Sequence, residues 1–190
     1  MKTIRFKIEG TQPMLQKNPQ TVNPFNKFTK ELKPLTAKKK KSDEDNDLIY
    51  RIQFESCFYI NGSGQYIIPA THFWKSVTSA AKEQKLGKKF EQSFCVFEDC
   101  ILDFPEKNLT PEQLYDEQSH VDIRDTGIKG SRIPACRAIF NDWSTIVECY
   151  YDENEINTEQ VIQFMEIAGR RYGVGTYRQK FGRFNATVIK

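Results

Sequence analysis

The C-terminal segment "AGRRYGVGTYRQKFGRFNATVIK" combines glycines, cations and aromatic rings and contains no acidic residue. Gly173, Gly175 and Gly182 permit backbone conformations with positive φ, and exposed amides at such places can contact phosphate oxygens. Cations neutralise phosphates, and aromatic rings stack on bases. The segment therefore predicts binding of nucleic acid or of another anionic partner. The candidate contacts are Arg170, Arg171, Gly173, Gly175, Tyr177, Arg178, Lys180, Phe181, Gly182 and Arg183.

An ordinary helix end offers a second interpretation of the same residues. Glycine and basic side chains are favoured at helix C-termini, and the arginines would then point into solvent. Phosphate-binding loops of the Walker type and glycine motifs for dinucleotides are excluded, because their spacing is absent and because this loop follows a helix instead of opening one.

A second stretch rich in glycine and cations, "DIRDTGIKGSRIPACR", covers residues 122–137. It lies between expected strands and is typical of a projecting hairpin, which could contact a phosphate backbone or a neighbouring subunit. A polar surface loop is the alternative. The candidate contacts in this stretch, together with one lysine near the start of a predicted helix, are Lys129, Arg132, Arg137 and Lys75.

Patterns for catalysis or metal binding are scarce. The five cysteines are scattered without a CxxC pair, and His72 and His120 are the two histidines. Nothing matches a Ser-His-Asp arrangement, an HExxH helix or paired carboxylates. We therefore expect no catalytic residue, no metal and no cofactor, with reduced thiols in a cytosolic protein. An acid–base nuclease built from His72 or His120 with a lysine is the alternative.

Composition favours one soluble domain over residues 1–190. The chain has 38% hydrophobic and 28% charged residues and a formal net charge of +3, which by itself does not predict nucleic-acid binding. The start "MKTIRFKIEG" lacks the apolar core of a signal peptide, and no stretch reaches the ~18 apolar residues of a membrane span. A cytoplasmic location is expected.

The expected elements follow hydrophobic periodicity and end signals. Residues 2–9 place Ile4, Phe6 and Ile8 on one face of a strand, and Thr71 is predicted to cap a helix that runs to about residue 85. Asn157 with Gln160 resembles a capping box for a second helix, which Gly173 ends. Strands are predicted at 93–104, at 134–140 and 143–151 joined by a turn, and at 183–189.

This order predicts an α+β fold with a ferredoxin-like (RRM-like) core, in which two helices pack on a four-stranded antiparallel sheet. Two insertions interrupt it. Residues 10–47 contain four prolines and a lysine run at 38–41. We interpret these residues as a loop that is flexible over 36–47. The lysines form either a solvated tether or an arm that touches phosphates. Residues 48–60 are expected to be β-rich, and 105–133 irregular, with a short helix at "TPEQLYDE".

Three segments together resemble the RAMP superfamily, the RNA-binding proteins of CRISPR effector complexes, and especially the subunits that coat the guide RNA. They are "IEGTQPMLQ" at 8–16, "YIIPATHFWKSVTSAAK" at 66–82 and "GVGTYRQKFGRF" at 173–184. The resemblance implies RNA binding, oligomerisation along the strand and a finger-like hairpin that sets the spacing. It also allows a short phage-encoded relative.

The leading hypothesis is a non-enzymatic protein that binds single-stranded nucleic acid, RNA rather than DNA, as a homo-oligomer. The first alternative is a metal-independent RNA-processing endonuclease of the same superfamily. The second is a phage interaction protein that mimics or inhibits a host nucleic-acid complex.

Overall fold

The computed structural model describes the backbone of residues 1–128, 131–178 and 180–189, and the side chains of these residues except 126–128 and 131–133. The chain forms two compact units. Unit 1 comprises Met1–Leu15, Ile60–Lys107 and Phe140–Lys190, and unit 2 comprises Gln16–Tyr59 and Asn108–Ile139. The segments predicted as insertions thus supply most of unit 2, while the single-domain organisation stays a prediction.

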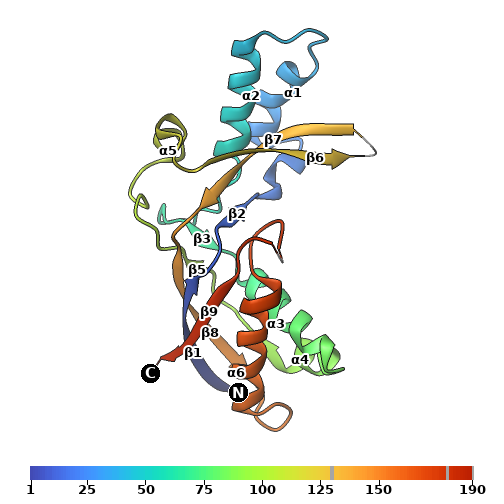
Figure 1. Cartoon of the computed structure of the whole chain (residues 1–190), viewed down its shortest axis with the longest axis vertical. Helices are drawn as coiled ribbons and strands as arrows, with labels where there is room; N and C mark the ends of the chain where they lie inside the picture. Colours follow the sequence, from blue (N-terminus) through green and yellow to red (C-terminus); the bar gives the residue numbers. More distant parts are fainter. Residues whose placement is uncertain (129–130, 179, 190) are drawn as a thin grey trace. The chain divides into compact units, whose positions relative to one another are not determined.

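The sheet of unit 1 has the ferredoxin-like order (Figure 1). Its antiparallel strands lie in the order β4-β8-β1-β9, so the first core strand lies between the third and the fourth. The predicted fold class is confirmed. The strands are β1 (Lys2–Gly10), β4 (Phe94–Cys95), β8 (Ser144–Tyr151) and β9 (Phe184–Ile189).

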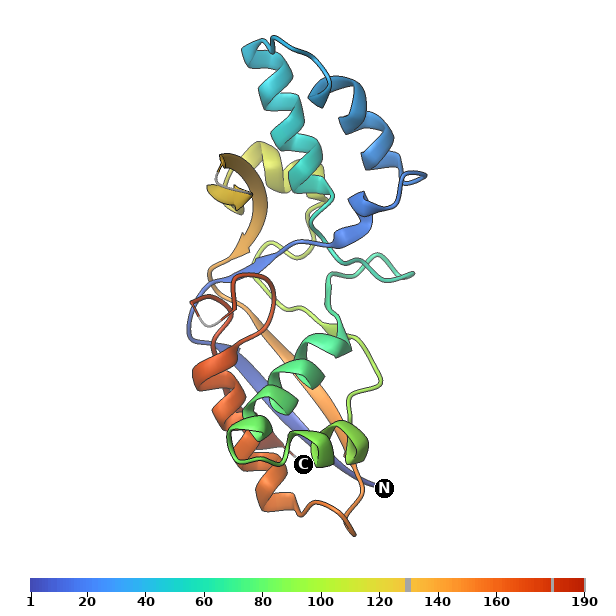
Figure 2. The ribbon, with the colours of Figure 1, turned by 90° about the vertical axis from the view of Figure 1, so that its right-hand side faces the viewer.

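Helices cover one face of this sheet, and they lie in front of it in Figure 2. They are α3 (Ala70–Glu83), α4 (Gly87–Ser93) and α6 (Thr158–Ile167), which continues into one turn of π-helix, η2 (Ala168–Tyr172). The covered face of β1 is the predicted one, since Phe6 and Ile8 are fully buried. Rings fill the layer between helices and sheet: Phe73 contacts Phe184 with a centroid distance of 5.7 Å.

The ends of the two core helices were predicted with unequal success. The capping box of Asn157 with Gln160 is present, and Gly173 ends η2 with a φ of 66°. The predicted Thr71 cap is wrong: α3 begins after Pro69, and the amide of Ala70 donates to the carboxylate of Asp99 at 2.9 Å. The helix start is therefore capped by a carboxylate that is distant in the sequence, and not by the side chain of Thr71.

Two strand predictions need correction. The strand expected at 93–104 is divided into β4 and β5 (Cys100–Ile101), and β5 pairs with β3 (Ile67–Ile68). The strands expected at 134–140 and 143–151 do not pair with each other. β7 (Ser131–Phe140) pairs with β6 (Val121–Ile128), whereas β8 pairs with β1. The predicted hairpin at 122–137 is therefore the β6–β7 pair.

Unit 2 is more helical than predicted. β2 (Met14–Gln16) leads from unit 1 into it, and residues expected to be loop form η1 (Pro19–Val22) and α1 (Lys27–Thr36). Residues 48–55, expected to be β-rich, lie in α2 (Asp43–Glu55), and α5 (Pro111–Glu117) is the predicted short helix. Residues 43–55 form a helix because its start is stabilised in two ways. Ser42 and Asp45 form a capping box, and the first turn contains three acidic residues, which interact favourably with the helix dipole.

Among the described residues, every helix is too short or too polar to span a lipid bilayer.

Candidate nucleic-acid interface

The terminal loop, residues 173–183, is held by backbone hydrogen bonds. Val174 donates to the carbonyl of Gly182 at 2.9 Å, which closes the loop on itself. Gly182 donates to Pro13, and Thr176 to Leu15, both at 2.8 Å, which fastens the loop to the segment that leaves β1. In Figure 1 this red loop lies beside the blue chain after β1. The loop is therefore a fixed element of unit 1.

The glycines serve this internal packing. Gly173, Gly175 and Gly182 all have positive φ, and a Cβ on Gly182 would lie 1.9 Å from the carbonyl oxygen of Val174. A Cβ on Gly175 would lie 2.4 Å from the carbonyl oxygen of Leu15. These glycines therefore allow close approach to other parts of the protein backbone, and not to a nucleic-acid backbone as the sequence suggested. The amides of the buried Gly173 and Gly182 donate to Ala168 and Pro13, so we leave both glycines out of the candidate interface.

The tip of the loop presents charge and one ring to solvent. A turn in which Phe181 donates to the carbonyl of Tyr177 at 3.1 Å leaves Arg178 and Lys180 exposed, with Tyr177 46% exposed. The Lys180 ammonium lies 5.8 Å from the ring centroid of Phe181, which is half-buried. Arg183 is exposed at the base of the loop. These side chains are exposed, as contacts with nucleic acid require, and the contacts themselves stay a prediction.

Two exposed arginines lie in η2, and one of them, Arg171, is already paired with a carboxylate. Arg171 forms an ion pair with Glu83 of α3, and the hydroxyl of Tyr172 donates to the same carboxylate at 2.8 Å. Glu83 therefore neutralises part of the charge at Arg171. Arg170 is also exposed.

His72 and Lys75 lie in the first two turns of α3. Burial lowers the pKa of His72 to about 4, and the positive charges of Arg178 and Lys75 act in the same direction. The imidazole is therefore neutral at pH 7 and adds no charge. Lys75 is exposed and does add charge: it and Arg178 both act electrostatically on His72, so α3 and the loop each present a cation around this imidazole.

The hairpin in unit 2 contributes less than predicted. Lys129 and the side chain of Arg132 lie outside the described residues. Arg137 is only 4% exposed, so its guanidinium is not presented to a phosphate, and we leave it out of the candidate interface. His120 is 5% exposed, and its Nδ1 lies 2.8 Å from the carbonyl oxygen of Ile139, which indicates a structural role.

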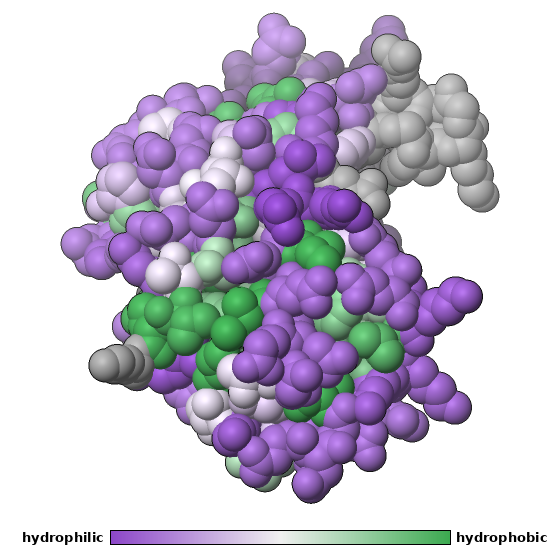
Figure 3. Space-filling view, turned by 60° about the horizontal axis from the view of Figure 1, so that its bottom comes forward, coloured by the Kyte–Doolittle hydropathy of each residue, from purple (hydrophilic) through white to green (hydrophobic). Residues whose placement is uncertain are grey.

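The open face of the sheet differs from that of sheets that bind RNA by stacking. Those sheets carry aromatic rings on their central strands. Among the described residues, the outward positions of β1 and β8 hold one ring, Tyr150, which lies beside Phe97 with a centroid distance of 5.1 Å. Figure 3 shows apolar side chains that reach the surface among polar ones. The terminal loop is the better candidate for nucleic acid.

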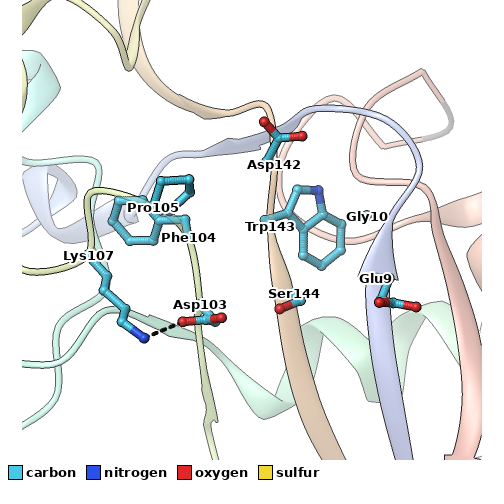
Figure 4. Close-up of a pocket in the computed structure, with 9 residues that line it drawn as sticks. All are labelled: Glu9, Gly10, Asp103, Phe104, Pro105, Lys107, Asp142, Trp143 and Ser144. Carbon is cyan, nitrogen blue, oxygen red and sulfur yellow. Dashed lines mark hydrogen bonds and ion pairs between the residues drawn. The ribbon is translucent and has the colours of Figure 1, made fainter.

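Trp143 is a positioning residue that the sequence analysis missed. Its indole N–H donates to the carbonyl of Gln12 at 2.9 Å, and its ring occupies the place that a Cβ on Gly10 would need, 2.3 Å away. Trp143 thus holds residues 10–12 in place, next to the backbone groups that bond to the terminal loop. The adjacent pocket of about 510 Å³ holds Glu9, Asp103 and Asp142, with Lys107 paired to Asp103 at 2.5 Å (Figure 4). This acidic lining disfavours phosphates.

Comparisons with known proteins rest on structure. Neither a family model nor a curated protein matches the sequence. A chain of the Type III-B Cmr-beta complex bound to cognate target RNA aligns with 100% of this chain at 15% identity and a TM-score of 0.51. The chain shares the fold of that Cmr-beta chain. It spans 61% of the length of that Cmr-beta chain. Cmr6 from Pyrococcus furiosus aligns with 98% of both chains at 12% identity and a TM-score of 0.46.

The ferredoxin-like core brings together the three segments on which the sequence resemblance was based. Residues 11–15 hold the terminal loop through backbone hydrogen bonds. The helix of the middle segment packs on the end of the last one, where Phe73 contacts Phe184, and the positive charge of Arg178 lowers the pKa of His72 in that helix. The resemblance is thus confirmed for the fold.

Proposed function

We propose that the protein binds single-stranded RNA through its terminal-loop surface, which we define as Lys75, Arg170, Tyr177, Arg178, Lys180 and Arg183. One observation carries the proposal: a loop fixed by its backbone presents several exposed cations and a ring from neighbouring elements of one unit. Phosphates and bases are the groups that such a surface recognises together.

The fixed backbone matters for affinity. A mobile loop would lose conformational freedom on binding, whereas a loop already held at Pro13 and Leu15 loses little. RNA is preferred over DNA because the aligned Cmr-beta structure is that of a complex bound to target RNA. In the proposed role the protein binds without cleaving, and several copies bind along one strand.

Titration of a fluorescent single-stranded RNA against the nuclease-treated protein tests this function. We expect binding that weakens as salt rises, with a log–log slope of about −0.7 for each phosphate contacted. A duplex of the same sequence serves as the control and should bind more weakly, because its bases cannot stack on Tyr177. Equal binding to any polyanion, such as heparin, or no binding at low salt would contradict the proposal.

An endonuclease is the second candidate, and the position of His72 is the observation that favours it. Its imidazole is neutral at pH 7 and so has a lone pair that could accept a proton from a ribose hydroxyl, although burial and the charges of Arg178 and Lys75 make it a weak base.

We expect no cleavage when the protein is incubated with labelled RNA in a chelator and the products are separated on a denaturing gel. Cleavage that His72→Ala abolishes, with an unchanged melting temperature, would establish the enzyme and overturn the binding-only function. His120→Ala is the control, because His120 is buried in unit 2 and bonded to the backbone.

A further inference from the structure

A loop in unit 2 holds two large apolar side chains in water. Val22, the last residue of η1, is 81% exposed, and Phe25, in the short segment between η1 and α1, is 80% exposed. Single exposed apolar residues are common on protein surfaces. Phenylalanine is enriched at protein interfaces, so Phe25 is the candidate anchor, and Val22 adds apolar area beside it in the sequence.

This docking loop, residues 20–26, is fixed by side-chain hydrogen bonds. The amide of Gln20 donates to the carbonyl of Ser56 at 2.8 Å, and Asn26 donates to the amide oxygen of Gln20 at 3.2 Å. Asn23 accepts from the backbone amide of Phe25 at 3.0 Å. A loop held in this way presents its anchors without further ordering, which favours docking.

Unit 1 has a groove that suits such an anchor. It lies on the open face of the sheet, has a volume of about 580 Å³, and is lined by Ile146, Ile189, Tyr150 and Ile101 among others. Ile146 is 50% exposed and Ile101 is 52% exposed. The volume is within the roughly 300–1,000 Å³ of sites that take apolar groups.

The charges of the loop and the groove are complementary. Four carboxylates line the groove against two cations, which gives it a net charge of −2. The docking loop itself has no charged residue, but residues 17–30, which include it and its flanks, contain three exposed lysines and no acidic residue, so this segment has a net charge of +3. The carboxylates are Glu98, Asp99, Asp103 and Glu148, the two cations are Arg5 and Lys7, and the lysines are Lys17, Lys27 and Lys30.

We propose that the docking loop of one copy inserts Val22 and Phe25 into the sheet groove of a second copy. The contact joins two different surfaces, so each copy has a free loop and a free groove to continue the assembly. Neither surface includes residues of the terminal-loop surface, so the inference does not depend on RNA binding. A contact of this size is weak on its own, and dissociation constants of the order of 10 µM are expected.

Sedimentation velocity of the nuclease-treated protein from about 5 to 200 µM tests the contact, in the range where weak interfaces assemble. The wild type should assemble as concentration rises and dissociate as salt rises. Phe25→Asp and Ile146→Asp should each raise the dissociation constant at least about 10-fold. Leu48→Asp and Val188→Asp, at 44% and 45% exposed sites outside the two surfaces, are the matched controls and should assemble normally.

Mixing the two defective variants distinguishes this interface from others. Phe25→Asp retains an intact groove and Ile146→Asp retains an intact loop, so an equimolar mixture should form a one-to-one dimer and nothing larger. A wild type that stays monomeric throughout, variants that assemble normally, or a mixture that stays monomeric would overturn the inference. A Phe25→Asp variant that assembles normally but binds RNA more weakly would instead assign the loop to base stacking.

Discussion

Replacing both Arg178 and Lys180 by alanine should lower the affinity for single-stranded RNA about 25-fold at 0.1 M salt. Each phosphate contact on a single strand contributes about 0.7 to the log–log salt slope, which corresponds to a factor of about 5 at this salt concentration. The slope should therefore become shallower by about 1.4. Both side chains are exposed at the loop tip, so the fold should not change. Fluorescence anisotropy at several salt concentrations measures both quantities.

The control removes the same charge elsewhere in unit 1. Lys2 and Lys88 are exposed and lie outside the terminal-loop surface, so Lys2→Ala with Lys88→Ala should leave both affinity and slope nearly unchanged. Equal effects of the two double variants would show that net charge alone drives binding. An unchanged affinity in the Arg178 and Lys180 variant would make the loop an ordinary helix end and would favour the interaction-protein alternative.

Gly182→Ala should be among the most damaging single substitutions in the chain. Its Cβ would lie 1.9 Å from the carbonyl oxygen of Val174, and its φ of 70° already costs about 1–2 kcal/mol for a residue with a side chain. Because the obstructing atoms are backbone, the hydrogen bonds from Val174 to Gly182 and from Gly182 to Pro13 must break. We expect the free energy of unfolding to fall by at least about 3 kcal/mol, with RNA affinity lost as the tip moves.

Urea unfolding followed by circular dichroism measures this loss. Gly62→Ala is the matched control, because a Cβ at Gly62 meets no described atom within 4 Å, and its effect should stay within about 0.5 kcal/mol. If Gly182→Ala kept the wild-type stability, the loop would not be fastened to residues 11–15 as described. If it kept stability and lost RNA binding, the glycine would act directly at the ligand.

Local patterns in the sequence were sufficient for the ferredoxin-like core. The alternation of Ile4, Phe6 and Ile8 identifies the buried face of β1, and the Asn157 capping box locates the start of α6. The helix at 43–55 could also have been predicted, because Ser42 and Asp45 have the spacing of a capping box. The β-branched and aromatic residues that follow favoured a strand, but packing overrides such propensities.

For the candidate site, the sequence by itself determined which residue types gather near the C-terminus, and the tertiary structure decided what each of them does. The cations and Tyr177 at the loop tip are exposed, because exposure there depends mainly on local polarity, and their contact with nucleic acid stays a prediction. The role of the glycines, the burial of Arg137 and the anchoring by Trp143 could not be read from the sequence. Each depends on contacts between distant positions, such as the bond from Trp143 to Gln12 across 131 residues, and only the folded chain brings such positions together.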